Sequence, residues 1–220
     1  MNEFYKIEMD HYKRKSHFDY FNSLAFPYVG TTVNIDITKL QSAVKAQKLP
    51  FFLTICYCVS RAANAVPEFR QRIANGGIIE YENCRTSHTV ALEDGTYCYC
   101  TLEDRLSFWD YLEYGRLEQQ IAKEKRDIEE NDAANDLLYI STLPWLSYAA
   151  LVQPVPVPAD SNPRITWGKF FTQNERILLP VSVLCHHALV DGKHIADFYE
   201  ALAEQCERVC ELISTDPISI

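Results

Sequence analysis

Two adjacent histidines, His186 and His187, stand near the C-terminus within the run Leu184-Cys185-His186-His187-Ala188-Leu189-Val190-Asp191-Gly192-Lys193. Imidazole has an unperturbed pKa of roughly 6.5, so a histidine side chain can take up and release a proton near neutral pH. Asp191 follows His187 by four residues across a turn, a spacing that does not guarantee contact but lets the carboxylate help to fix the local fold. The run therefore favours acid–base chemistry, with a buried histidine that only satisfies backbone groups as the alternative.

This run and the residue that follows it contain side chains of the types that bind metal ions: His186, His187, Asp191 and His194. Adjacent residues of a strand point to opposite faces, so His186 and His187 are not expected to bind one ion. We therefore predict no metal site, and a metal-binding protein remains the less favoured reading.

Apolar segments on both sides must position these histidines. Ile177 to Leu184 is the most apolar run of the chain and predicts a buried strand that ends at the histidines. Gly192 permits a turn. Beyond it apolar residues recur at steps of three and four, which predicts an amphipathic helix with the buried residues Ile195, Phe198, Leu202, Cys206, Val209 and Ile213.

The motif from His186 to Gly192 resembles the His-His-x-x-x-Asp-Gly signature of chloramphenicol acetyltransferases and their coenzyme A-dependent acyltransferase relatives. Three more stretches resemble segments of that family in the same order along the chain: Tyr12-Lys13-Arg14-Lys15-Ser16-His17-Phe18, Pro67-Glu68-Phe69-Arg70 and Ile140-Ser141-Thr142-Leu143-Pro144-Trp145. Because four collinear stretches agree, the resemblance extends over nearly the whole chain.

The resemblance implies an O-acetyltransferase that moves an acetyl group from acetyl-CoA to a hydroxyl of chloramphenicol, an activity of antibiotic resistance. His187 matches the general base, which would take the hydroxyl proton during direct attack without an acyl-enzyme, and Ser141 matches the serine that donates to the oxyanion. Asp191 and Arg14 match a buried ion pair that holds the motif in place. His186 is then expected to be structural.

The resemblance also implies binding residues. The acceptor pocket is expected at Tyr20, Phe21, Val29, Tyr97, Leu151 and Thr166, and the coenzyme A site at Trp145, Lys169 and Phe170. Four acceptor positions depart from the pattern of chloramphenicol enzymes, because aromatic, leucine or cysteine side chains are replaced by Pro27, Val29, Leu151 and Gln153. We therefore expect weaker capture of chloramphenicol. Acetyl transfer to a different small alcohol, or a non-catalytic ligand-binding protein, are the alternatives.

The rest of the chain is predicted to alternate strands and helices, which is typical of an α/β layered sheet. Helices are predicted at 38–48, 51–66 and 107–126, and strands at 29–35, 78–81, 89–92, 97–102, 137–141, 146–152, 164–172 and 177–186. Residues 123–135 are predicted to be a solvated loop and residues 153–163 a proline-rich connection. The resemblance implies a two-layer sandwich with a mixed β-sheet and helices packed on one side. It further implies a single acyltransferase domain (residues 1–220) in a homotrimer, with the active site at the subunit interface.

Composition narrows the class of protein. A length of 220 residues with 47% hydrophobic residues is enough for a large core, and a formal net charge of -9 argues against nucleic-acid or anionic-membrane partners. No apolar run approaches about 18 residues, and Met1-Asn2-Glu3 does not resemble the start of a signal peptide. The eight cysteines lack the spacing of a disulfide scaffold or a zinc site, so a cytoplasmic location is expected.

Overall fold

A mixed β-sheet forms one layer of the molecule in the computed structural model, which describes residues 3–128 and 135–215. Its strands lie in the order β2-β10-β8-β7-β5-β6, and β9 pairs with β10 beside this path. The β5–β7 and β7–β8 pairs are parallel and the others antiparallel. The bounds are β2 (Tyr28–Asp36), β5 (Arg85–Ala91), β6 (Tyr97–Leu102), β7 (Leu137–Leu143), β8 (Arg164–Gly168), β9 (Phe171–Gln173) and β10 (Arg176–His186).

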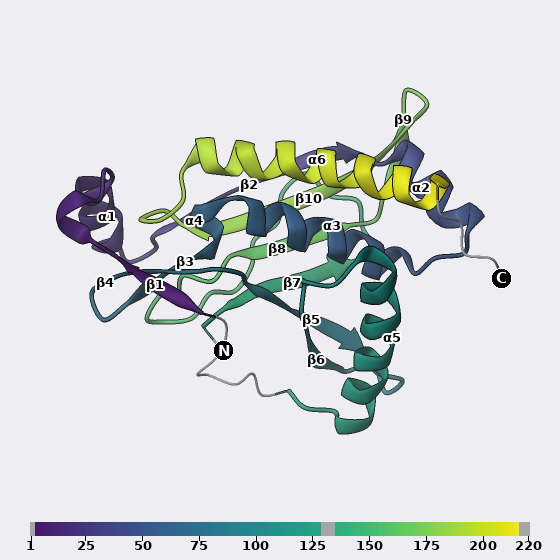
Figure 1. Cartoon of the computed structure of the whole chain (residues 1–220), viewed down its shortest axis with the longest axis horizontal. Helices are drawn as coiled ribbons and strands as arrows, with labels where there is room; N and C mark the ends of the chain where they lie inside the picture. Colours follow the sequence, from purple (N-terminus) through teal and green to yellow (C-terminus); the bar gives the residue numbers. More distant parts are fainter. Residues whose placement is uncertain (1–2, 129–134, 216–220) are drawn as a thin grey trace.

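Helices α2 (Thr38–Ala46), α3 (Phe51–Ala65) and α6 (Gly192–Thr215) form the second layer along one face of this sheet (Figure 1). The six apolar residues predicted for the buried side of α6 are all buried, and Tyr199 of that helix donates a hydrogen bond to the carbonyl of Val181 on β10 at 2.8 Å. Helix α5 (Phe108–Lys125) packs against β5 and β6. The predicted α/β sandwich with helices on one side of a mixed sheet is therefore confirmed. None of the helices in the described part of the chain is long and apolar enough to span a membrane.

A second, smaller sheet has the order β1-β4-β3 and lies beside the N-terminal helix α1 (Figure 1). It brings the N-terminal strand β1 next to a hairpin that follows the one-turn helix α4. The sequence predicted only β4 among these elements, because short elements leave too few residues for a periodic pattern. Their bounds are β1 (Phe4–Ile7), η1 (Met9–His11), α1 (Lys15–Asn22), α4 (Pro67–Arg70), β3 (Gln71–Ala74) and β4 (Gly77–Tyr81).

The strand predicted at residues 146–152 is wrong, because this segment has no strand structure. Its start is tied to the end of β8: Lys169 N–H donates to the Leu146 carbonyl at 2.7 Å, and Ser147 Oγ donates to the Lys169 carbonyl at 2.6 Å. A Cβ at position 168 would lie 2.6 Å from that Leu146 carbonyl, so glycine is required at this crossing. The predicted strand 164–172 is interrupted there and forms β8 and β9 instead. The predicted loop at 123–135 begins later, since α5 includes Lys123 to Lys125, and its residues 129–134 lie outside the described residues.

Alternation along the strands separates the two faces of the large sheet. Val181 is fully buried among the core residues on the helix side. The opposite face has four hydroxyl side chains at directly paired positions on neighbouring strands, from Ser141 on β7 through Thr166 on β8 and Ser182 on β10 to Thr32 on β2. The Thr32 and Ser182 oxygens lie 2.7 Å apart. We call these four residues the hydroxyl row.

Candidate active site

His187 is the first residue after β10 and is held on three sides. Its backbone N–H donates to the Pro27 carbonyl at 2.7 Å, and its ring stacks on Phe21 with centroids 3.7 Å apart. Nδ1 lies 2.9 Å from the Val190 carbonyl, which can only accept a hydrogen bond. The proton of a neutral imidazole is therefore on Nδ1, and Nε2 carries the lone pair that a general base needs.

Arg14, at the start of α1, binds the turn that follows His187. Its guanidinium donates to the Leu189 carbonyl and, at 3.4 Å, to the His187 carbonyl, and its Nε lies 3.3 Å from Asp191 Oδ2. The planar fork of arginine suits this combination of two carbonyls and a carboxylate. The ion pair implied by the resemblance is present, but 37% of the Asp191 side chain is exposed, so the pair is not a buried one.

Asp191 fixes the beginning of α6. Its Oδ1 accepts from the Lys193 N–H at 3.0 Å and lies 3.5 Å from His194 Nδ1. Partial burial raises the pKa of this carboxyl, but the His194 charge, the Lys193 N–H and Arg14 together hold it below its usual value. Asp191 thus acts on the position of the turn, through contacts to residues other than His187.

His186 points into the protein, with 3% of its surface exposed. Its Nδ1 accepts from the Ala188 N–H at 3.3 Å, and Tyr28 packs edge-on against its ring. Burial lowers its pKa to about 4, so the ring is neutral at pH 7. These contacts suit a structural histidine.

Ser141 belongs to the hydroxyl row and lines two cavities. One of about 400 Å³ has several polar residues in its lining, among them Thr89, Tyr99, Gln153, Asp160 and Arg164. The other, of about 740 Å³, is more apolar and includes Phe52, Tyr97, Leu143 and Trp145. The structure thus places Ser141, Tyr97 and Trp145, all predicted site residues, around one cavity.

The structure does not bring Ser141 and His187 together within one chain. Ser141 is in register with Ser182, two strands away at about 4.8 Å per strand, and His187 lies five residues further along β10 at about 3.3 Å per residue. The two residues are therefore separated by on the order of 20 Å. We call Arg14, Phe21, His187 and Asp191 the histidine half-site, and Ser141 with Thr166, Leu151 and Gln153 the serine half-site.

The remaining predicted residues divide between these half-sites. Tyr20 is 62% exposed and packs edge-on against Phe21, and Val29 packs against the core opposite Cys185. On the other side, Leu151 lines a third cavity of about 480 Å³, Trp145 is 76% exposed, and Phe170 contacts Phe51 edge-on. Lys169 is exposed near them.

Two features of the site were not assigned from the sequence. Gln153 was noted only as a departure from the family pattern, yet its Oε1 accepts a hydrogen bond from Thr166 Oγ1 at 3.0 Å. The Val190 carbonyl fixes the His187 tautomer. A backbone carbonyl leaves no signal in side-chain types, whereas the amide of Gln153 could have been recognised as a polar group in a pocket expected to be apolar.

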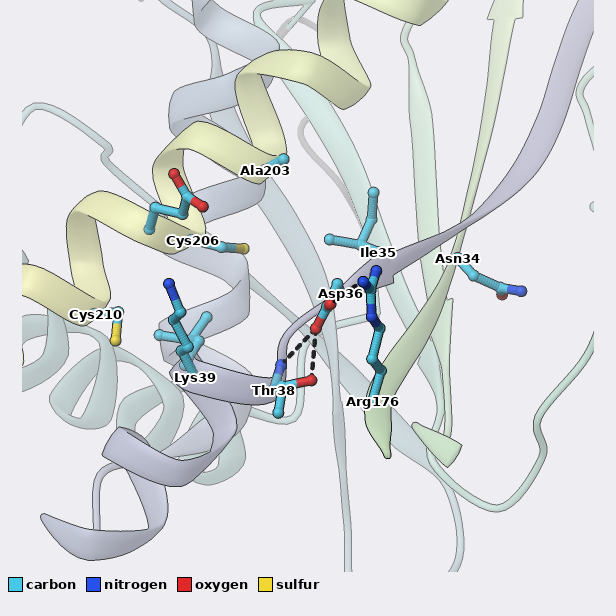
Figure 2. A pocket seen from close by; sticks show the side chains of 11 residues that line it. Asn34, Ile35, Asp36, Thr38, Lys39, Arg176, Ala203, Cys206 and Cys210 are labelled. Atoms are coloured by element: carbon cyan, nitrogen blue, oxygen red, sulfur yellow. Dashed lines mark hydrogen bonds and ion pairs between the residues drawn. The ribbon is translucent and has the colours of Figure 1, made fainter. Parts of the chain in front are cut away.

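A further cavity of about 500 Å³ lies at the opposite end of β10, between α2 and α6 (Figure 2). It is lined by charges of both signs, including Asp36, Lys39 and Arg176, and Asp36 is bonded to Thr38. It contains none of the predicted site residues. Among the described residues, no group of three histidine, cysteine or acidic side chains could hold a metal ion.

The family model described as chloramphenicol acetyltransferase matches residues 1–203. The chain belongs to the chloramphenicol acetyltransferase family. It is 29% identical over 211 residues to chloramphenicol acetyltransferase 2 of Escherichia coli, covering 94% of this chain and 98% of that protein. It is 27% identical over 205 residues to a Klebsiella sp chloramphenicol acetyltransferase, and the match covers 91% of this chain and 93% of that protein.

Solved structures share the fold of this chain. A chloramphenicol acetyltransferase structure has a TM-score of 0.83 at 24% identity and covers 93% of this chain and 100% of its own. The dihydrolipoamide acetyltransferase of Azotobacter vinelandii has the same fold at a TM-score of 0.70 and 18% identity, and the match covers 90% of this chain and 88% of that chain. The family membership makes this chain an acyltransferase enzyme.

Proposed function

We propose that this family member transfers the acetyl group of acetyl-CoA to a hydroxyl of chloramphenicol, with His187 as the general base. The observation that carries the proposal is the His187 tautomer, because its Nδ1 is bonded to Val190 and its Nε2 is left to accept a proton. As the hydroxyl oxygen attacks, its proton moves to Nε2, the C–O bond forms and the C–S bond of the thioester breaks. The proton then passes from His187 to the coenzyme A thiolate, so the enzyme returns to its starting state.

Ser141 is proposed to donate its hydroxyl to the oxyanion of the tetrahedral intermediate. The apolar cavity between Ser141 and Trp145 supports this role, because it would admit the thioester arm of coenzyme A beside the serine. Trp145 and Phe170 would pack against the coenzyme, and Lys169 would meet its phosphates. Tyr97 and Thr166 would contribute to the acceptor pocket, as would Leu151.

A complete site on this proposal needs two copies of the chain. The separation of about 20 Å between His187 and Ser141 prevents one chain from presenting both groups to one carbonyl carbon. We propose a homotrimer in which the histidine half-site of one subunit, with Tyr20, Phe21 and Val29, faces the serine half-site of the next. The large exposed apolar side chains of Tyr20, Trp145 and Val152 support such a contact. The use of acetyl-CoA favours a cytoplasmic enzyme.

Coenzyme A release with a thiol reagent tests the proposal directly. The purified protein should release coenzyme A from acetyl-CoA only when chloramphenicol is present, with one O-acetylated product per coenzyme A. Gel filtration of the same sample should give the mass of a trimer. Release that does not depend on chloramphenicol, or a monomer that is fully active, would contradict the proposal.

A further inference from the structure

Gln153 stands between two cavities on the open face of the sheet. It lines both the 400 Å³ cavity that holds Ser141 and the 480 Å³ cavity that holds Ser182 and Thr32. One end of its amide is bonded to Thr166 in the middle of the hydroxyl row. The other end has no hydrogen-bond partner among the described residues, so it is available to a ligand on either side.

The cavity beside Ser141 has further polar groups that are held in place. Arg164 and Asp160 form a two-point ion pair with both N–O distances at 2.8 Å, and Tyr28 Oη donates to Asp160 Oδ1 at 2.9 Å. The Arg164 guanidinium lies 5.2 Å from the centre of the Tyr139 ring, which also lines the cavity. Groups fixed in this way lose little conformational freedom when they bind a ligand.

A purely apolar ligand would offer no hydrogen bonds to the polar groups of this lining. It would cover the Gln153 amide and the Asp160–Arg164 pair without replacing the hydrogen bonds that water makes to them, and buried polar groups without partners weaken binding. A molecule with several hydroxyl groups would satisfy them. The volume of about 400 Å³ lies within the usual range for small-molecule sites.

We propose that this enzyme also acetylates compact polyhydroxylated alcohols of the sugar class, and that Gln153 selects them. The inference rests on the proposed acetyl transfer and extends it to a second class of acceptor. The reacting hydroxyl lies at Ser141, and its neighbours on the ring bond to the Gln153 amide and the Asp160–Arg164 pair. The chemistry is unchanged: the hydroxyl proton goes to His187 and then to the coenzyme A thiolate, while the acetyl carbon exchanges its bond to sulfur for a bond to oxygen.

Three acceptors and two variants test this proposal. The acceptors are methyl glucoside, cyclohexanol, which has a similar ring with one hydroxyl, and chloramphenicol. Coenzyme A release is measured for the parent protein, for Gln153→Leu and for the control Gln120→Leu, which makes the same change on the exposed side of α5. Thermal melting of each protein shows that the variants fold.

The parent is expected to acetylate methyl glucoside with a kcat/KM at least about 100-fold above that for cyclohexanol, since a site built to bond hydroxyls rejects an analogue that lacks them. Gln153→Leu should lower the ratio of the methyl glucoside kcat/KM to the chloramphenicol kcat/KM about 10-fold, the scale of one hydrogen bond. Gln120→Leu should have the same kcat/KM values as the parent for all three acceptors.

Equal use of methyl glucoside and cyclohexanol, or an unchanged preference in Gln153→Leu, would overturn the inference. If the parent protein still acetylates chloramphenicol while either of these results is obtained, the proposed function remains intact. A parent protein that binds acetyl-CoA but acetylates none of the three acceptors would overturn both.

Discussion

The two half-sites of this acyltransferase are built in different ways. In the histidine half-site several hydrogen bonds and an ion pair hold the turn in place: His187 is bonded to Pro27 and Val190, and Arg14 to Leu189 and Asp191. In the serine half-site, Ser141 lines two cavities, and the cavity of about 400 Å³ is bounded in part by Gln153, Pro154 and Pro156, which have no regular secondary structure. On the proposed mechanism, the turn thus carries the chemistry, and the sheet face away from the helices determines which acceptor binds.

This difference suggests that substitutions in the two regions change different quantities. A change in the histidine turn should alter the rate of the chemical step or the stability of the fold, because the turn has little freedom to adapt. A change on the open face should alter which alcohol binds, because cavities there can change shape without disturbing the core.

The largest expected effect follows from removing the proposed base. His187→Ala should lower turnover by at least about 100-fold, the usual scale of general-base catalysis, with an unchanged oligomeric mass. His186→Ala is the matched control, and we expect it to lower the melting temperature because it leaves a cavity in a buried position. Steady-state kinetics and melting curves of both proteins would reveal a wrong assignment if the two patterns were exchanged.

The sharpest test of the division into half-sites is complementation. Ser141→Ala should lose about 100-fold in turnover when its oxyanion contact is removed. When it is unfolded and refolded together with His187→Ala, roughly a quarter of the interfaces in a random mixture would combine an intact histidine with an intact serine. Activity should therefore return to roughly that fraction of the parent value. Two variants that stay inactive after joint refolding would show that each chain supplies both residues to its own site.

A double-mutant cycle measures how rigidly the turn is held. Arg14→Ala should lower the free energy of unfolding by about 2–3 kcal/mol, because two carbonyls and a carboxylate lose a charged donor. Asp191→Ala should cost about 1 kcal/mol, because its side chain is partly exposed. The double variant should cost less than the sum. Urea unfolding gives all three values, with Lys13→Ala as an exposed control, and strictly additive losses would mean that the two side chains do not interact in solution.

Acid should weaken the turn in a defined range of pH. His186 has a pKa of about 4 in the folded protein against 6.5 when unfolded, so protons favour the unfolded chain. Its contribution to stability is complete above pH 6.5 and is lost as the pH falls toward 4, at no more than about 1.4 kcal/mol per pH unit. His88, which burial also holds at a pKa of about 4, adds a second contribution of the same sign. His186→Gln should roughly halve the slope of unfolding free energy against pH in this range, and an unchanged slope would contradict the assignment.

The smallest effect is expected on the open face. Leu151 lines the 480 Å³ cavity, so Leu151→Phe should fill part of it and lower the KM for chloramphenicol a few-fold with kcat unchanged. Val29→Phe, in the region of the histidine half-site, should lower the KM for chloramphenicol less than Leu151→Phe does, because Val29 packs against the core. A parent KM already within the range of its chloramphenicol-acetylating relatives would remove the reason for this prediction.

Much of the histidine half-site could be predicted from the sequence, because its parts are continuous. The strand, the histidines, the turn and the helix occupy one stretch of chain from 177 to 213, and periodicity identifies both flanking elements. Arg14 was placed only through the family resemblance, since spacing cannot show that a residue 175 positions away meets the turn.

The serine half-site was harder to predict for physical reasons. Residues 146–152 are largely apolar, which is typical of a buried strand. The Leu146 carbonyl, however, accepts a hydrogen bond from the Lys169 N–H where it passes close to Gly168, and the segment does not join the sheet. Tertiary bonds of this kind override local preference. The polar character of the cavity depends on Asp160, Arg164 and Gln153 converging on one place, and no local pattern marks that convergence.

The pairing of β2 with β10 has a consequence for the nascent chain. In the described structure, β2 is an edge strand whose one neighbour in the sheet is β10, and the Thr32–Ser182 contact joins residues 150 positions apart. At a translation rate of about 5–20 residues per second, on the order of ten seconds pass between the synthesis of β2 and the synthesis of β10. During that interval its backbone groups are an open template for pairing with other strands. A message cut short before the codon for Arg176 would release a chain in which β2 never acquires its partner strand.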